Sequence, residues 1–258
     1  MCLVSSVLCH AYPMAIISTE AIVLRTIDHR ETSRIAFFFT RNHGKVIGVL
    51  KGIRKDPRKF GSSLDKFSVN DIVYYEYRNS EIHLVSQCDM KEFFLAIRSD
   101  MRKITAAEYA AELVNKIMPV EERNPGIYAL LLDYLRALGE VEDVSRLVHM
   151  FQIKVLSLSG FRPHIDSCVR CGKEVGNRAR FSTRLGGLVC GGCVGRADDL
   201  MQVSAGAIAT LLYVEKNNWP TCRKLHMPPG IRKELRLVLN NFLIFHLGKN
   251  IKAARYLH

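Results

Sequence analysis

The spacing of hydrophobic residues changes once along the chain, near residue 95. Before that point, apolar and aromatic residues form short runs separated by turn residues, which is typical of β-strands. The runs predict five strands, over residues 16–25, 34–40, 45–50, 71–78 and 82–86. The turn signals Asn42-His43-Gly44 and Asn79-Ser80 stand between consecutive runs.

Five antiparallel strands with mostly short connections indicate a small closed barrel of the OB type. Barrels of this kind bind single-stranded nucleic acid on one face. A fragment of a β-sandwich or an SH3-like barrel has a similar strand count and stays an alternative at this point.

Beyond residue 95, apolar residues recur at steps of three and four, which predicts amphipathic helices. We expect the first helix to begin at a Ser99 cap and the second to open at Pro125. The predicted helices span residues 99–118, 125–138, 144–159, 204–216 and 231–247. The sequence therefore predicts an α+β protein, a five-stranded barrel followed by a helical bundle.

Two Cys-x2-Cys pairs interrupt the helical region. Cys168 with Cys171 and Cys190 with Cys193 stand 18 residues apart, which is the pattern of a four-thiolate zinc site. We expect one structural zinc ion per chain, held by these four residues and closed to substrates, with glycines at positive φ in the turns. The alternatives are a disulfide framework, a redox dithiol or an iron–sulfur cluster.

The composition is that of a globular protein in a reducing compartment. The chain has 258 residues, 48% of them hydrophobic, and no apolar run long enough to cross a membrane. The first residues do not have the charge pattern of a signal peptide, and we interpret residues 1–13 as a disordered extension, with Met14 as a candidate start. The remaining cysteines are isolated, which suits the cytosol.

The net charge is +12, and it is unevenly distributed. Residues 14–80 carry 12 Lys and Arg against 7 acidic residues, and residues 223–258 carry 8 against 1. Residues 81–161 reverse the balance, with 9 against 12. This asymmetry favours a polyanionic partner, with nucleic acid first and an acidic membrane second.

The connection over residues 51–70 is the most basic part of the strand region. Up to Phe67 it contains six cations and two anions, with Phe60 and Phe67 among them. Cations neutralise phosphates and exposed rings stack on unpaired bases, so we expect this loop to contact nucleic acid. The two phenylalanines could equally anchor the loop in the core.

The patterns together predict a division into five segments. These are an extension (1–13), an OB-type barrel (14–95), a first helical part (96–163), a four-Cys zinc finger (164–200) and a second helical part with a basic tail (201–258). No phosphate-binding Gly-rich loop, nucleophile elbow, His-Glu-x-x-His motif or dense carboxylate cluster occurs in the sequence. Carboxylates gathered from separate strands, as in a nuclease, remain an open alternative.

Several short stretches, in this order and spacing, resemble bacterial RecO recombination mediators from about residue 14 to the end. The stretches are Thr19-Glu20-Ala-Ile-Val-Leu24-Arg25, Glu31-Thr-Ser-Arg34-Ile35, His43-Gly44-Lys45, Lys51-Gly52-Ile-Arg54-Lys55, Arg58-Lys59-Phe60-Gly61, Gly160-Phe161-Arg-Pro163 before the cysteines, and Ala254-Arg255-Tyr256-Leu257. Residues 1–13 have no counterpart in the family.

The resemblance implies a non-catalytic DNA repair protein of the bacterial cytoplasm and nucleoid. Such proteins bind single- and double-stranded DNA, anneal strands, engage RecR and single-strand-binding protein, and help RecA to load. The family's DNA contacts map by position onto Arg34, Lys45, Lys51, Arg54, Lys55, Arg58 and Lys59. The family's pocket for the tail of single-strand-binding protein lies in the helical domain, and the sequence does not assign it to residues. An RNA-binding barrel with a zinc ribbon is the main alternative, followed by a nuclease.

Overall fold

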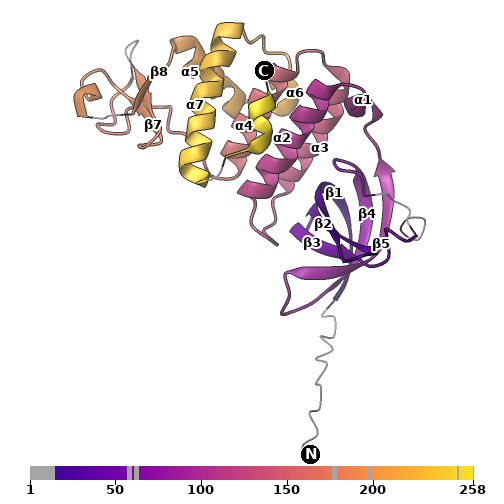
Figure 1. The fold of residues 1–258 in the computed structure, drawn as a ribbon. Coiled ribbons are helices and arrows are strands. Elements are labelled where there is room, and N and C mark those ends of the chain that lie inside the picture. The colour runs from indigo at the N-terminus through magenta and orange to yellow at the C-terminus, as the bar shows by residue number, and fades with distance from the viewer. Residues whose placement is uncertain are drawn as a thin grey trace, which may run out of the picture. The chain divides into compact units, whose positions relative to one another are not determined.

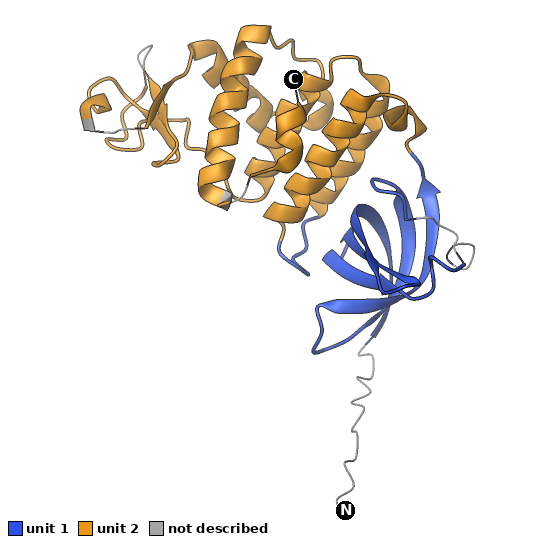
Figure 2. Cartoon of the chain, in the orientation of Figure 1, with its two compact units in different colours: residues 1–93, 119–124 blue, residues 94–118, 125–258 orange. Residues whose placement is uncertain are grey.

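The computed structural model describes residues 15–56, 60, 64–175, 179–196, 199–248 and 250–257. The predicted extension over residues 1–13 lies outside the described residues. The chain forms two compact units: residues 1–93 with 119–124, and residues 94–118 with 125–258 (Figure 2). The first unit therefore contains a short segment that follows the first long helix of the second unit.

The first unit is the predicted five-stranded barrel, which is closed in the order β1-β2-β3-β5-β4 (Figure 1). The strands are β1 (Ala15–His29), β2 (Ser33–Thr40), β3 (Gly44–Leu50), β4 (Val69–Glu76) and β5 (Ile82–Glu92). Neighbouring strands are antiparallel, except that β3 and β5 are parallel where they close the barrel. This architecture confirms the OB-type prediction.

Strand β1 is longer than the sequence pattern predicts because two neighbours share it. Its first half pairs with β4 and its second half pairs with β2, with an irregularity between Val23 and Arg25 where the register shifts. Such a bulge bends a strand and raises its twist, which lets one strand follow the curvature of a closed barrel. The exposed end of β1, around Ile27, lacks the apolar alternation on which the shorter prediction depended.

The second unit is a helical bundle that carries a small three-stranded sheet. Its helices are α1 (Leu95–Arg98), α2 (Met101–Ile117), α3 (Pro125–Glu140), α4 (Val144–Leu158), α5 (Ala205–Lys216), α6 (Trp219–Cys222) and α7 (Pro229–Leu247). Two 3₁₀ helices, η2 (Val194–Arg196) and η3 (Lys252–Tyr256), follow the second cysteine pair and α7. The apolar stripes of α2, α3 and α4 are buried, as their spacing predicts.

The start of α2 differs from the prediction. Asp100, not Ser99, caps the helix, because its carboxylate accepts the Arg102 N–H at 2.8 Å. Ser99 instead ends the short helix α1 and donates its hydroxyl hydrogen to the Ala96 carbonyl at 3.2 Å. A one-turn helix has too few residues to produce a periodic signal, so the sequence pattern missed both α1 and α6.

The C-terminal segment η3 is fixed to the middle of α2. The Glu112 carboxylate accepts the backbone N–H groups of Lys252 and Ala253, each at 3.0 Å, and pairs with Lys116 at 2.6 Å. Burial opposes ionisation of Glu112, but these hydrogen bonds outweigh it and lower the pKa of the carboxyl group. One carboxylate thus joins residues 140 positions apart in the chain.

The segment over residues 119–124 extends the barrel at β3. Val120 forms a parallel bridge with Lys45, and the Glu121 N–H donates to the Lys45 carbonyl at 2.9 Å. His83, which is 1% exposed, lies 3.2 Å from the Glu121 carboxylate through Nε2. These contacts explain why residues 119–124 belong to the barrel unit.

Gly44 makes this close approach possible. Its φ is +66°, and a Cβ at this position would lie 2.3 Å from the Glu122 carbonyl oxygen. Gly52 also has a positive φ, of +82°, but its Cβ would meet nothing within 4 Å. A side chain at Gly52 would therefore cost backbone strain alone, whereas a side chain at Gly44 would cost strain and a steric clash.

We predict that Gly44→Ala lowers the free energy of unfolding by about 2–4 kcal/mol, because it combines a left-handed backbone with a clash against fixed backbone atoms. Gly52→Ala should cost only about 1–2 kcal/mol, the strain alone. Urea unfolding of both variants measures the difference. Equal losses in the two variants would show that residues 119–124 are not held against Gly44.

Candidate metal centre and nucleic-acid interface

The four predicted cysteines meet at one point of the second unit. Cys168 and Cys171 lie in the turn region after α4, and Cys190 and Cys193 follow strand β7 (Gly187–Val189). Their four sulfur atoms all lie within 4.8 Å of one another, and those of Cys171 and Cys190 are 3.6 Å apart. All four are free thiols, so the disulfide alternative does not apply.

The spacing of the sulfur atoms fits a tetrahedral metal site. Metal–sulfur bonds of about 2.3 Å produce a tetrahedron with edges of about 3.8 Å. The Cys190 N–H also donates to the Cys168 sulfur at 3.3 Å, a contact that stabilises a thiolate. Four thiolates fill a tetrahedron, and the His164 ring instead contacts the Ser167 hydroxyl at 2.8 Å. The cysteine group is therefore positioned to bind a metal ion.

The two cysteine turns use glycine differently. Gly172 has φ +71° and its N–H donates to the Cys168 carbonyl at 2.9 Å, which closes the first turn as expected. In the second turn the Cys193 N–H donates to the Cys190 carbonyl at 2.9 Å, but Gly191 and Gly192 do not have a positive φ. The expectation of left-handed glycines is confirmed for the first turn and wrong for the second.

A small sheet connects this centre to the bundle. Strand β6 (Arg180–Ser182) lies between β7 and β8 (Leu200–Gln202). Phe181 of β6 is fully buried and packs edge-on against Phe242 of α7, with ring centroids 6.2 Å apart. A metal ion at the cysteines would therefore stabilise a sheet that already rests on the helical core.

The barrel carries a groove of about 420 Å³ at the end where β1 turns into β2. Ile35 and Val49 are cross-strand partners in the groove wall, and Ile82, 40% exposed, lies at the start of β5. The polar rim consists of His29, Arg30, Thr32, Ser33 and Lys51. Apolar side chains beside cations suit the binding of single-stranded nucleic acid, which presents bases and phosphates together.

Of the predicted DNA-binding residues, Lys51 lines this groove, and Arg34 and Arg54 lie next to it. Arg34 lies opposite Leu50 in the sheet, next to Lys51, and the Arg54 N–H donates to the Thr32 carbonyl at 2.9 Å. The guanidinium groups of Arg34 and Arg54 both approach Asp28, at 3.0 and 3.8 Å. Exposed ion pairs of this kind are worth about 0–1 kcal/mol, so a phosphate can compete for the arginines.

The other predicted residues are placed differently. Lys55 is exposed and follows Arg54 in the same turn. Lys45 lies six residues before Lys51, about 20 Å away along β3, beside residues 119–124. Arg58 and Lys59 lie outside the described residues. The structure thus brings together part of the predicted set and separates Lys45 from it.

Phe60 and Phe67 are not exposed for stacking on bases. They are 2% and 5% exposed, and Phe60 packs in the barrel core with Leu64. The alternative reading of the two rings as core anchors is therefore confirmed. Their burial fixes the ends of the basic loop to the barrel.

Sequence reasoning missed His29 and Arg30. The pairing of Asp28 with Arg34 and of Arg34 with Leu50 places this turn beside Lys51. The available signal in the sequence is the short turn His29-Arg30-Glu31-Thr32 between two strands. Only the register of β2 against β3 shows that this turn lies beside Lys51.

None of the helices in the described part of the chain is long and apolar enough to cross a membrane.

Two family models together match nearly the whole chain. The model described as "Recombination protein O N terminal" matches residues 14–94, and "Recombination protein O C terminal" matches residues 98–255. The boundary between the matches lies close to the chain's passage from the barrel to α1.

Full-length relatives show the same similarity. The chain is 32% identical over 246 residues to "DNA repair protein RecO" of Pelotomaculum thermopropionicum, covering 95% of this chain and 94% of the relative. The protein of the same name from Myxococcus xanthus is 32% identical, with coverages of 92% and 95%. That from Anaeromyxobacter dehalogenans strain 2CP-C is 29% identical, with 93% and 95%.

We predict that replacing Cys171 with Ser removes most of the bound metal from the purified protein, because three thiolates and a hydroxyl hold a soft metal poorly. The wild-type chain should carry one ion, measured by elemental analysis of protein purified without chelator. Cys222→Ser is the matched control, since Cys222 is buried away from the cluster and donates to the Val214 carbonyl at 3.4 Å. A metal content that is unchanged by Cys171→Ser would contradict the site.

Proposed function

The chain belongs to the RecO family of DNA repair proteins, and from this premise we propose that it is a non-catalytic DNA-binding recombination mediator. It binds single- and double-stranded DNA and anneals complementary strands. With RecR it helps RecA to replace single-strand-binding protein on DNA. It acts in the bacterial cytoplasm, where it has access to the chromosome.

The observation that carries the proposal is the groove at the turn between β1 and β2. Lys51, Arg54 and Lys55 are exposed beside it, and Arg30 extends the row of cations across the turn. The groove walls at Ile35 and Val49 are apolar. Phosphates pair with the rim while bases cover the apolar walls, and neither contact depends on sequence.

In this proposal, DNA binding uses Lys51, Arg54, Lys55 and Arg34, together with Arg58 and Lys59 of the same loop. Lys45 contributes from the other end of β3, on a strand that passes beneath the groove. A DNA strand in contact with both Lys45 and Lys51 would have to run along the length of β3. The basic residues of the C-terminal half offer a second DNA contact, which annealing of two strands requires.

We further propose that the metal is one zinc ion, bound by Cys168, Cys171, Cys190 and Cys193. Four thiolates form a closed tetrahedral site of the structural type, with no position left for substrate. Its role is to stabilise the basic finger against α7. Its removal should loosen the sheet β7-β6-β8 before it affects the barrel.

We predict that Lys51→Glu, Arg54→Glu and Lys55→Glu in one chain weaken binding of single-stranded DNA about tenfold or more at low salt. The plot of log affinity against log salt should become flatter by about 0.7 for each lost phosphate contact. Fluorescence anisotropy over a salt series measures both quantities.

The matched control is Lys91→Glu, which reverses an exposed charge at the far end of β5, where Lys91 pairs with Glu20 at 2.8 Å. The control should bind like wild type. Unchanged affinity in the triple variant would remove the groove from the proposal. RNA that competes as well as DNA of the same length would favour an RNA-binding module instead.

We predict that the wild-type chain accelerates annealing of complementary strands coated with single-strand-binding protein, because two basic surfaces can hold two strands together. The triple variant should anneal more slowly, and the DNA should stay intact in the presence of magnesium. Stopped-flow fluorescence with strands labelled at complementary ends measures the rate. Annealing no faster than without the protein, or cleavage that persists after repurification, would overturn the mediator proposal.

A further inference from the structure

The four cysteines of the metal centre differ in how far solvent reaches them. Cys168 is 1% exposed, Cys190 and Cys193 are half-buried, and Cys171 is exposed. Four thiolates complete a tetrahedron, so a reagent from solvent finds no open position on the metal. It can reach the cluster only through a sulfur atom, and Cys171 is the most accessible of the four residues.

A second sulfur atom lies close to that of Cys171, on the other cysteine turn. The sulfur atoms of Cys171 and Cys190 are 3.6 Å apart. A disulfide bond is about 2.05 Å long, so the two atoms need to approach by only about 1.5 Å. A Cβ on Gly172 or Gly192 would meet nothing within 4 Å, so both turns have room for a shift of this size.

Cys168 is less available than Cys190 as a partner for Cys171. Its sulfur atom is buried and accepts the Cys190 N–H at 3.3 Å, and its own N–H donates to the Lys173 carbonyl at 2.9 Å. Thiol–disulfide chemistry depends on access to the attacking sulfur atom. Access and distance together therefore favour a bond between the two turns over a bond within the first turn.

We propose that the cysteine cluster is also a thiol oxidation site, at which a hydroperoxide converts Cys171 and Cys190 into a disulfide and the bound metal is released. Cys171 is the residue that the oxidant attacks, and Cys190 is the residue that resolves the oxidised sulfur. The inference rests on the proposed metal site and is independent of the DNA contacts on the barrel.

The reaction transfers two electrons to the hydroperoxide in two steps. The Cys171 thiolate attacks one oxygen atom of hydrogen peroxide, the O–O bond breaks, hydroxide leaves and a sulfenic acid forms. The Cys190 thiolate then attacks the Cys171 sulfur atom, the S–S bond forms, the S–O bond breaks and a second hydroxide leaves. Each hydroxide takes a proton from solvent, so two thiolates become one disulfide and the peroxide becomes two water molecules.

The disulfide replaces the metal as the link between the two cysteine turns. Only Cys168 and Cys193 remain as thiolates, and half of a four-thiolate site holds a soft metal poorly. The new covalent bond joins the segment before β6 to the turn after β7, and the Phe181 ring still packs on Phe242. The oxidised chain therefore keeps the sheet β7-β6-β8 attached, whereas a reduced chain without metal has no link between the turns.

The first test treats the full, zinc-loaded chain with hydrogen peroxide in small molar excess. One zinc ion per chain should be released as two thiols disappear, measured with a chromogenic chelator and by thiol titration. Dithiothreitol with added zinc should restore the metal. Cys222→Ser is the matched control, because Cys222 is fully buried away from the cluster, and it should release zinc like wild type. Zinc that stays bound, or that cannot be restored, would overturn the proposal.

Peptide mapping identifies the disulfide. Trypsin cleaves after Arg170 and so separates Cys168 from Cys171, and fragmentation in the mass spectrometer distinguishes Cys190 from Cys193. The cross-link should join Cys171 to Cys190. In Cys190→Ser the oxidation should stop at the sulfenic acid, which dimedone labels at Cys171. A disulfide within one turn, or no dimedone adduct at Cys171 in that variant, contradicts the assignment.

Thermal unfolding tests whether the disulfide takes over from the metal. The oxidised chain should unfold at a higher temperature than the reduced chain stripped of zinc by a chelator, because only the oxidised chain has its turns joined. Equal midpoints would contradict this role of the disulfide. Failure of the metal-site proposal is distinguishable, since it would appear as a chain without metal before any peroxide is added.

Discussion

Closure of the barrel is the constraint on which the first unit depends. In a closed barrel every strand pairs along both edges, and β1 closes this one by pairing its first half with β4 and its second half with β2. The same pairing sets the register of the β1–β2 turn against β3, and so places Arg30 beside Lys51. The basic rim is thus a consequence of how the barrel closes, and does not require a dedicated domain.

In the second unit, a metal ion at the cysteines would stabilise the small three-stranded sheet, which has little hydrophobic core of its own. The sheet β7-β6-β8 has strands of three residues, and such short strands bury too little apolar surface to be stable alone. Phe181 against Phe242 supplies an apolar contact with the bundle, and a metal at the cysteines would join the segment before β6 to the turn after β7. A basic segment can thereby remain ordered with few buried residues.

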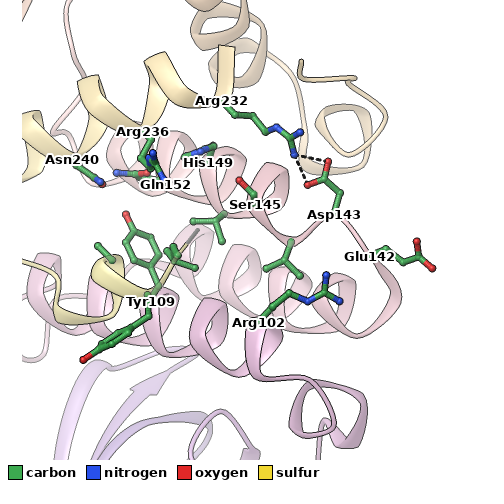
Figure 3. Close-up of a pocket in the computed structure, with 15 residues that line it drawn as sticks. Arg102, Tyr109, Glu142, Asp143, Ser145, His149, Gln152, Arg232, Arg236 and Asn240 are labelled. Carbon is green, nitrogen blue, oxygen red and sulfur yellow. Dashed lines mark hydrogen bonds and ion pairs between the residues drawn. The ribbon is translucent and has the colours of Figure 1, made fainter. Parts of the chain in front are cut away.

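The sequence predicted what depends on local periodicity or on fixed spacing. The strand runs, the longer helices and the four cysteines belong to this class, because their signals lie within a few turns or in one motif. What it could not predict depends on register and on long-range contacts. Phe60 and Phe67 resemble stacking residues in sequence and are buried in the structure, and Lys45 looks continuous with Lys51 although it lies at the other end of β3. The helical unit also has a cavity lined by Tyr109 of α2, His149 of α4 and Arg236 of α7, and no sequence window contains these residues together (Figure 3).

The attachment of residues 119–124 to β3 bears on how the chain is made. During synthesis, the five strands leave the ribosome before α2, but the Lys45 carbonyl and the His83 ring have no partner from this segment until Glu121 appears. The barrel is therefore completed only after the first long helix of the bundle has been translated. Completion of the nascent barrel is thereby coupled to translation through α2, and a chain truncated after residue 93 would lack these contacts.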